Sequence, residues 1–287
     1  MAEEQSLEPA CRITSAQRVS AGQGAAWWRE AIELLSVDTE HWIMATLLLM
    51  VIGAVVGFVG SLVPYVGDLI TGLLIPVFSV GLLYMAYRVI HGHAFVYNNV
   101  LIGLRHRTKA LILAGAAQVG LQIVAYLALV AVTGLWGAST TTNDFSMSTE
   151  DIVVSGALGL VFFVLAMLLS CVYLAAVWFQ PALVFFGERG PIHSLRQSLR
   201  AVLINWRAFL MYGVVSIGLA ILPFAIIWLA LTLVRIWLAG VLAMVVYVLV
   251  VIAGGAISLF FFALITLTTY MAFRDIFGLE TEEARFL

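Results

Sequence analysis

Three histidines in one short connection are the residues best suited to metal chemistry. His91 and His93 are separated by a single glycine, and His106 follows in the same polar connection. Imidazole is a common ligand of transition metals. A metal site is only a weak candidate here, because no acidic residue lies in the connection and the chain lacks the Cys/His spacing typical of zinc. We therefore expect no bound metal and no cofactor.

Two amides four residues apart form a second candidate site. Gln118 and Gln122 lie in a long apolar stretch, and at helical spacing their side chains point the same way. An amide in hydrocarbon costs free energy unless it is hydrogen-bonded, so this face is expected to look into a helix bundle. It could line a substrate path, or it could hydrogen-bond between helices, which is the commoner arrangement.

The densest group of basic residues forms a third candidate site. Such a group at a membrane surface attracts anionic lipid headgroups, at about 1 kcal/mol per basic residue. The simpler alternative is that these charges only orient the protein in the membrane. The group consists of Arg189, His193, Arg196, Arg200 and Arg207.

No pattern typical of catalysis occurs in the chain. It has no spacing that pairs a nucleophile with a base, no paired carboxylates and no glycine-rich phosphate loop. Asp68 opens an apolar stretch, where the helix dipole accounts for a carboxylate. The apolar stretches otherwise hold no acid from which a proton relay could be built. Enzymatic activity and proton-coupled transport are therefore not expected.

The composition is that of a membrane protein. The chain is 63% hydrophobic and 10% charged, whereas soluble domains carry roughly 25% charged residues. A spanning helix needs about 20 mostly apolar residues, and six stretches meet that length. We predict an all-α, polytopic fold whose spans run approximately over residues 42–62, 68–89, 110–136, 152–179, 207–235 and 237–273.

The basic residues fix the predicted orientation. Thirteen of the 14 Lys and Arg residues fall on one side of this pattern, and only Arg235 falls on the other. Because short cytoplasmic loops carry an excess of Lys and Arg, both termini are predicted to be cytoplasmic. Residues 1–24 lack the apolar core of a signal peptide and are predicted to be a disordered tail. Residues 25–278 are predicted to form one six-helix domain, and residues 279–287 a short cytoplasmic tail.

Three amphipathic segments precede the odd-numbered spans. Residues 26–38, 94–107 and 191–206 each place apolar side chains on one face. Such helices lie at the membrane interface, with the apolar face in the lipid or against the bundle. We therefore predict a threefold repeat, in which each unit consists of one interfacial helix and the two spans after it. Tryptophans near the span ends are predicted to form an aromatic belt, and Gly53-x-x-x-Gly57 is expected to make a helix contact within or between chains.

Four short motifs carry a resemblance to a known family. They are LVPYVG at 62–67, PVFSVG at 76–81, NWRAFL at 205–210 and FRDIF at 273–277. In this order they resemble a family of proteobacterial inner-membrane proteins, the BPSS-type family, which is similar in layout to YciC-like proteins and to the membrane domain of some glycerophosphodiester phosphodiesterases. The resemblance implies a six-helix protein of a Gram-negative inner membrane and carries over no catalytic residues. No phosphodiesterase domain is present, so that activity is not inferred.

Two functions remain open from the sequence. The first is a non-catalytic inner-membrane protein that organises membrane lipids, expected to be anionic, or a partner membrane protein; no nucleic acid is expected. The alternative is a transporter or channel for a small or amphiphilic molecule. The alternative draws on the repeat, on the two glutamines, and on helix interruptions of the kind that frame transporter sites, at Pro76, Pro223 and Gly254-Gly255.

Overall fold

The computed structural model of the chain describes residues 12–63, 66–140, 149–237 and 240–280. These residues are almost entirely helical. The extended pieces among them are two-residue strands, β1 (Arg12–Ile13) and β2 (Leu279–Glu280), which pair antiparallel.

Six of the helices are long and apolar enough to cross a membrane. This confirms the prediction of a helical chain with six potential spans. The side of the membrane on which the termini lie, and the kind of membrane, stay predictions. The helices are α2 (Thr39–Ser61), α3 (Val66–Ile90), α4 (Thr108–Thr140), α5 (Thr149–Val177), α8 (Trp206–Trp237) and α9 (Gly240–Phe277).

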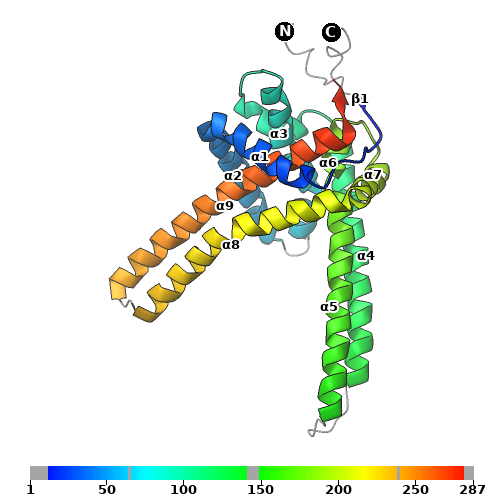
Figure 1. The fold of residues 1–287 in the computed structure, drawn as a ribbon, viewed down its shortest axis with the longest axis vertical. Helices are drawn as coiled ribbons and strands as arrows, with labels where there is room; N and C mark the ends of the chain where they lie inside the picture. The colour runs from blue at the N-terminus through cyan, green and yellow to red at the C-terminus, as the bar shows by residue number, and fades with distance from the viewer. Residues whose placement is uncertain (1–11, 64–65, 141–148, 238–239, 281–287) are drawn as a thin grey trace.

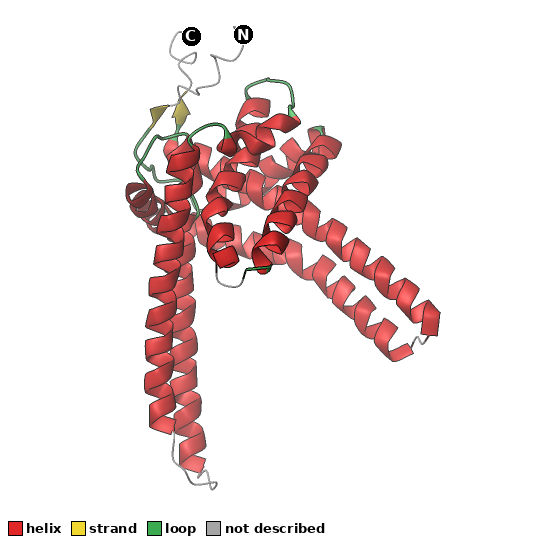
Figure 2. Cartoon of the chain, turned by 180° about the vertical axis from the view of Figure 1, so that it is seen from behind, coloured by secondary structure: helices red, strands yellow, loops and turns green. Residues whose placement is uncertain are grey.

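The six long helices form three hairpins that meet at one end. Helix α2 packs with α3, α4 with α5, and α8 with α9. Figure 1 shows the α4–α5 and α8–α9 hairpins diverging from a common region, and Figure 2 shows the same divergence from behind. We call this region the head. It contains the converging helix ends together with α1 (Gln23–Val37), the 3-10 helix η1 (Tyr97–Leu104), α6 (Gln180–Phe185) and α7 (Pro191–Ile204).

The buried core of the protein lies mainly in the head. Its largest fully buried side chains are aromatic, and their rings contact one another; Phe179, for example, lies 5.6 Å from Phe277 between ring centroids. Such pairs add directional contacts to dispersion. Away from the head the hairpins expose most of their apolar side chains. The buried aromatic residues of the head include Trp27, Trp28, Trp42, Phe179, Phe186, Tyr270, Phe273 and Phe277.

The tryptophans differ in burial between the head and the far end of α8. Trp42 was expected at the membrane interface, but its indole is buried in the head and packs edge-on against Phe95 at 5.2 Å. Trp228 and Trp237, toward the far end of α8, are 70% and 79% exposed. An indole offers a large apolar surface, which Trp42 buries within the protein. The position of the tryptophans relative to the membrane interface stays a prediction.

Short helices occur at all three segments predicted to be interfacial. The apolar face of α1 is covered by protein, since Trp27, Trp28 and Leu35 are buried and the helix packs against α8 and α9. Helix η1 packs mainly against α3, and α7 against α5. The position of these helices relative to lipid stays a prediction, and so does the threefold repeat.

The N-terminal segment differs from the predicted disordered tail over residues 12–24. Its backbone hydrogen-bonds the end of α9, with Thr14 N to Phe277 O at 2.8 Å and Gln17 N to Ile276 O at 2.8 Å. The buried Asn205 side chain accepts from Val19 N and donates to Gln17 O, both at 2.9 Å. The polar composition of residues 12–24 gives no indication of these bonds, because their partners lie far away in sequence. Residues 1–11 and 281–287 lie outside the described residues.

Close helix contacts use other glycines than the predicted pair. A Cβ on Gly81 of α3 would lie 2.0 Å from Val100 O of η1, and a Cβ on Gly24 of α1 would lie 2.0 Å from Ala208 O of α8. In contrast, a Cβ on Gly53 or Gly57 would meet nothing within 4 Å. The GxxxG motif therefore makes no close contact within the described chain.

We predict that Gly81→Ala destabilises the head whereas Gly53→Ala does not. Both glycines lie inside long helices, where alanine is intrinsically favoured by about 1 kcal/mol. At Gly81 the added methyl group collides with Val100 O, and overpacking of this kind costs about 1–3 kcal/mol. Thermal unfolding in detergent should show a lower midpoint for Gly81→Ala only. Equal midpoints for the two variants would contradict the contact between α3 and η1.

Candidate functional site

Helix α7 is held to the head by a narrow face of small and polar residues. It starts with Pro191 as its first residue, after Gly190 in an extended conformation, which is a favourable helix start. Ser194, Ser198 and Ala201 are the buried residues of the helix. They recur at intervals of three and four, so one stripe of α7 packs against α5, α6 and α4 while the opposite side stays open.

Ser198 joins α7 to a break between α5 and α6. Its hydroxyl donates to Ala175 O at 2.8 Å and accepts from Phe179 N at 3.0 Å. Both backbone groups lie where the chain turns from α5 into α6, so their helical partners are missing there. One buried hydroxyl thus satisfies a carbonyl and an amide, and it fixes the position of α7 on the head.

The open side of α7 carries the basic residues predicted from the sequence. His193, Arg196, Arg200 and Arg207 are all exposed, and we call them the basic ridge. At 100° per residue His193, Arg196 and Arg200 fall within one sector of α7. Arg207 lies in the first turn of α8, beyond the non-helical Asn205. Arg189 is also exposed and precedes α7. Within the described chain none of these arginines forms an ion pair, since the pairs found there involve His41, Arg107 and Arg274.

An exposed apolar flank lies next to the basic ridge. Ile192 is 64% exposed, Leu203 58% and Trp206 56%. The guanidinium carbon of Arg207 lies 5.4 Å from the centre of the Trp206 ring, in the range of a cation–π contact. Helix α7 therefore has three sides: a buried small face, an apolar flank and a cationic ridge.

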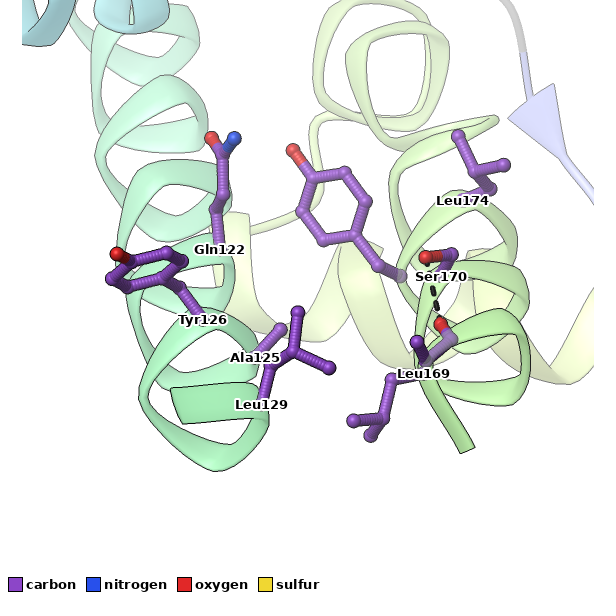
Figure 3. Close-up of a pocket in the computed structure, with 9 residues that line it drawn as sticks. Gln122, Ala125, Tyr126, Leu129, Leu169, Ser170 and Leu174 are labelled. Atoms are coloured by element: carbon purple, nitrogen blue, oxygen red, sulfur yellow. Dashed lines mark hydrogen bonds between the residues drawn. The ribbon is translucent and has the colours of Figure 1, made fainter. Parts of the chain in front are cut away.

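The two candidate glutamines lie in different surroundings. Gln118 is buried, and its amide nitrogen donates to Gln180 Oε1 at 2.6 Å. Gln122 is exposed and borders a cavity of about 410 Å³ between α4 and α5. Figure 3 shows Gln122 and Tyr126 on one side of this cavity, with Ser170 on the other. Gln118 thus makes the bond between helices that was one of its two predicted roles.

Sequence reasoning missed Gln180, the central amide of the head. Its side chain is fully buried, and its amide nitrogen donates to Pro191 O at 3.1 Å and lies 3.4 Å from Ala114 O. Gln180 therefore links α4, α6 and the first residue of α7. The sequence feature that could have revealed its position is the pair Gln180-Pro181, because proline favours the first turn of a helix and so indicates that a new helix begins there. It marks the start of α6 as well as the end of a span.

A second cavity lies where the three hairpins meet the head. It has a volume of about 330 Å³, and we call it the vault. Its walls come from α2, α3, α4, α5, α6 and α9. Residues that represent these helices are Leu49, Leu82, Gln118, Tyr173, Pro181 and Thr269.

The three candidate histidines are not gathered into a metal site. A ring nitrogen of His91 lies 2.7 Å from Tyr87 O, and its ring packs on that tyrosine at 4.4 Å. His93 is exposed. Among the described residues, no group of three or more His, Cys, Asp or Glu side chains is placed to hold a metal ion.

A carboxylate network at the end of α9 has a structural role. Asp275 Oδ2 accepts from Gln23 Nε2 at 2.7 Å and from Trp27 Nε1 at 3.0 Å, both on α1. The neighbouring Arg274 pairs with Glu30 of α1 at 2.7 Å. These bonds fasten α1 to α9 and leave no free carboxylate in the network for chemistry.

No protein-family model, curated protein or solved structure matches this chain.

We predict that Gln118→Leu destabilises the protein and that Gln122→Leu leaves its stability nearly unchanged. The two positions lie one turn apart on α4, so helix propensity and residue size are matched. Loss of the Gln118 amide leaves the buried Gln180 Oε1 without this donor, which costs about 1–3 kcal/mol. Unfolding midpoints in detergent measure the difference. The proposed interhelical role of Gln118 fails if the two midpoints are equal.

Proposed function

We propose that this chain is a multi-pass bacterial inner-membrane protein that organises anionic phospholipids through the basic ridge of α7. The observation that carries the proposal is the arrangement of α7. Exposed cationic side chains without ion-pair partners among the described residues lie beside an exposed apolar flank. A membrane interface offers the matching surfaces, with phosphate groups outside and hydrocarbon beneath.

The distribution of charge supports a cytoplasmic head. Arg29, Arg88, Arg105 and Lys109 lie on or beside head elements, whereas Arg235 lies at the far end of α8. Under the positive-inside rule the head then faces the cytoplasm. The inner leaflet is also where juxtamembrane basic residues gain about 1 kcal/mol each from anionic lipid. The repeat fits this arrangement, with α1, η1 and α7 each preceding one hairpin.

The attachment of α7 favours a fixed lipid contact over a loose one. Ser198, Gln180 and Asn205 bond the helix and its end to α5, to α6 and to the N-terminal segment. The ridge is therefore positioned before lipid arrives, and less conformational entropy is lost on binding. A partner membrane protein with an acidic surface would meet the same ridge, and co-purification would reveal it as added polypeptide mass.

The alternative function, transport of a small or amphiphilic molecule, has one specific observation in its favour. The cavity between α4 and α5 brings Gln122, Tyr126 and Ser170 to one apolar-walled space. Gln118, however, is engaged with Gln180 and does not border this cavity. Flux of an amphiphilic dye from liposomes that contain the protein, lost in Gln122→Leu, would favour transport over lipid organisation.

We predict that Arg196→Gln combined with Arg200→Gln lowers the enrichment of anionic lipid around the protein. Both guanidinium groups are exposed on the ridge, so the change removes about 2 kcal/mol of attraction to anionic headgroups without loss of a described ion pair. The measurement is the ratio of phosphatidylglycerol and cardiolipin to phosphatidylethanolamine in native nanodiscs, relative to the bulk membrane.

The control variant combines Arg29→Gln with Lys109→Gln. These residues are also exposed and basic, and they lie on α1 and α4. The net charge changes equally in both double variants. A difference in lipid ratio between them therefore comes from the position of the ridge residues and not from the charge alone. An identical lipid ratio in the ridge variant and the control would refute the proposal.

A further inference from the structure

The vault differs from an ordinary crevice in that all three hairpins contribute to it. Leu49 and Leu82 come from the first hairpin, Gln118 and Tyr173 from the second, and Thr269 from the third. The cavity also borders Pro181 of α6, so it adjoins the head. A molecule bound in the vault therefore contacts all three hairpins.

The walls of the vault are mostly apolar. They also carry Ser and Thr hydroxyl groups, the Tyr173 hydroxyl, and Trp178 Nε1, which has no hydrogen-bond partner among the described residues. Ser79 donates to Pro76 O at 3.1 Å, Thr266 to Phe262 O at 3.0 Å and Thr269 to Ile265 O at 2.8 Å. These hydroxyl hydrogens are therefore used within their own helices. A polar metabolite that entered the vault would lose its hydrogen bonds to water and would gain none from these hydroxyl groups. A hydrocarbon chain has no such hydrogen bonds to lose.

The surroundings of the vault indicate what occupies it. Apart from α6, the helices that bound it are long and apolar enough to cross a bilayer, and we infer that the space between them lies at the level of hydrocarbon. A void there forfeits dispersion contacts on every wall, and an apolar cavity of this size takes up hydrocarbon more readily than water. A flexible acyl chain can enter such a space from the side.

Hydrogen bonds join the wall of the vault to the start of α7. Gln118 borders the vault and bonds Gln180, which in turn donates to the carbonyl of Pro191 at the start of α7. Trp178 also borders the vault, and its ring packs edge-on at 5.9 Å against Phe209 of α8, two residues after Arg207. The vault, α7 and the start of α8 thus belong to one structural unit.

We propose that the vault holds one acyl chain of a membrane phospholipid, so that the three hairpins are packed around a bound lipid. The inference rests on the proposed function in one respect: the headgroup of that lipid lies at the basic ridge. The occupancy of the vault itself follows from its walls and its place in the bilayer.

The test uses two photoactivatable lipids with a diazirine near the end of one acyl chain. One is a phosphatidylglycerol and the other a phosphatidylethanolamine, each reconstituted with the full-length protein. Peptide mass spectrometry then locates the cross-links. We expect them to concentrate on the vault segments of α5 and α9, around residues 173–178 and 262–269, and to be competed by unlabelled lipid.

Thr266→Phe is the variant that fills the vault, and Thr232→Phe is its matched control. Both threonines donate to a carbonyl four residues earlier, but Thr232 lies on α8 and does not border the vault. Vault cross-links should fall several-fold in Thr266→Phe and stay at the wild-type level in Thr232→Phe. The wild-type cross-link map stands as an independent test if Thr266→Phe folds poorly.

The two proposals fail in distinguishable ways. Cross-links spread evenly over the exposed faces of all hairpins, unchanged by Thr266→Phe, would overturn the occupancy of the vault. Vault cross-links of equal yield from both lipids would uphold the acyl-chain site and overturn the anionic preference of the ridge. Concentrated cross-links that favour phosphatidylglycerol, and lose this preference in Arg196→Gln/Arg200→Gln, support both.

Discussion

The structure depends on one constraint: the three hairpins converge at the head, and besides this, among the described residues, only the first two pack closely along each other, through α3 and α4. In the head the aromatic side chains of α1, α6 and α9 pack into a closed core, and glycines such as Gly24 and Gly81 let backbones approach closely. Beyond the head the hairpins diverge and expose apolar side chains on most sides. In a bilayer, hydrocarbon must fill the intervening space, and lipid then becomes part of the packing of the protein.

Hydrogen bonding in the head determines where α7 lies. The break between α5 and α6 would leave backbone groups unsatisfied, and an unpaired buried polar group is costly. Ser198 and Gln180 satisfy groups at or near this break, and both connect it to α7. Asn205 does the same at the other end of α7, where it bonds the N-terminal segment. The basic ridge is therefore positioned by buried polar groups that lie outside it.

Local patterns in the sequence predicted the spans and the exposed basic residues, because hydropathy and charge are visible along the chain. The six long helices agree with the predicted stretches to within several residues at most ends, and the ridge residues are exposed as expected. The head was not predictable in the same way. Trp42 and Gln180 resemble interface and boundary residues, and their burial depends on partners far away in sequence. The ordered segment at residues 12–24 was missed for the same reason.

The most direct test of this account is an experimental structure of the protein in a nanodisc of phosphatidylglycerol and phosphatidylethanolamine. The account predicts open hairpins, an ordered phospholipid whose phosphate lies within hydrogen-bonding distance of Arg196 or Arg200, and one acyl chain in the vault. Hairpins closed against one another, with protein side chains filling the vault and no ordered lipid at α7, would contradict it.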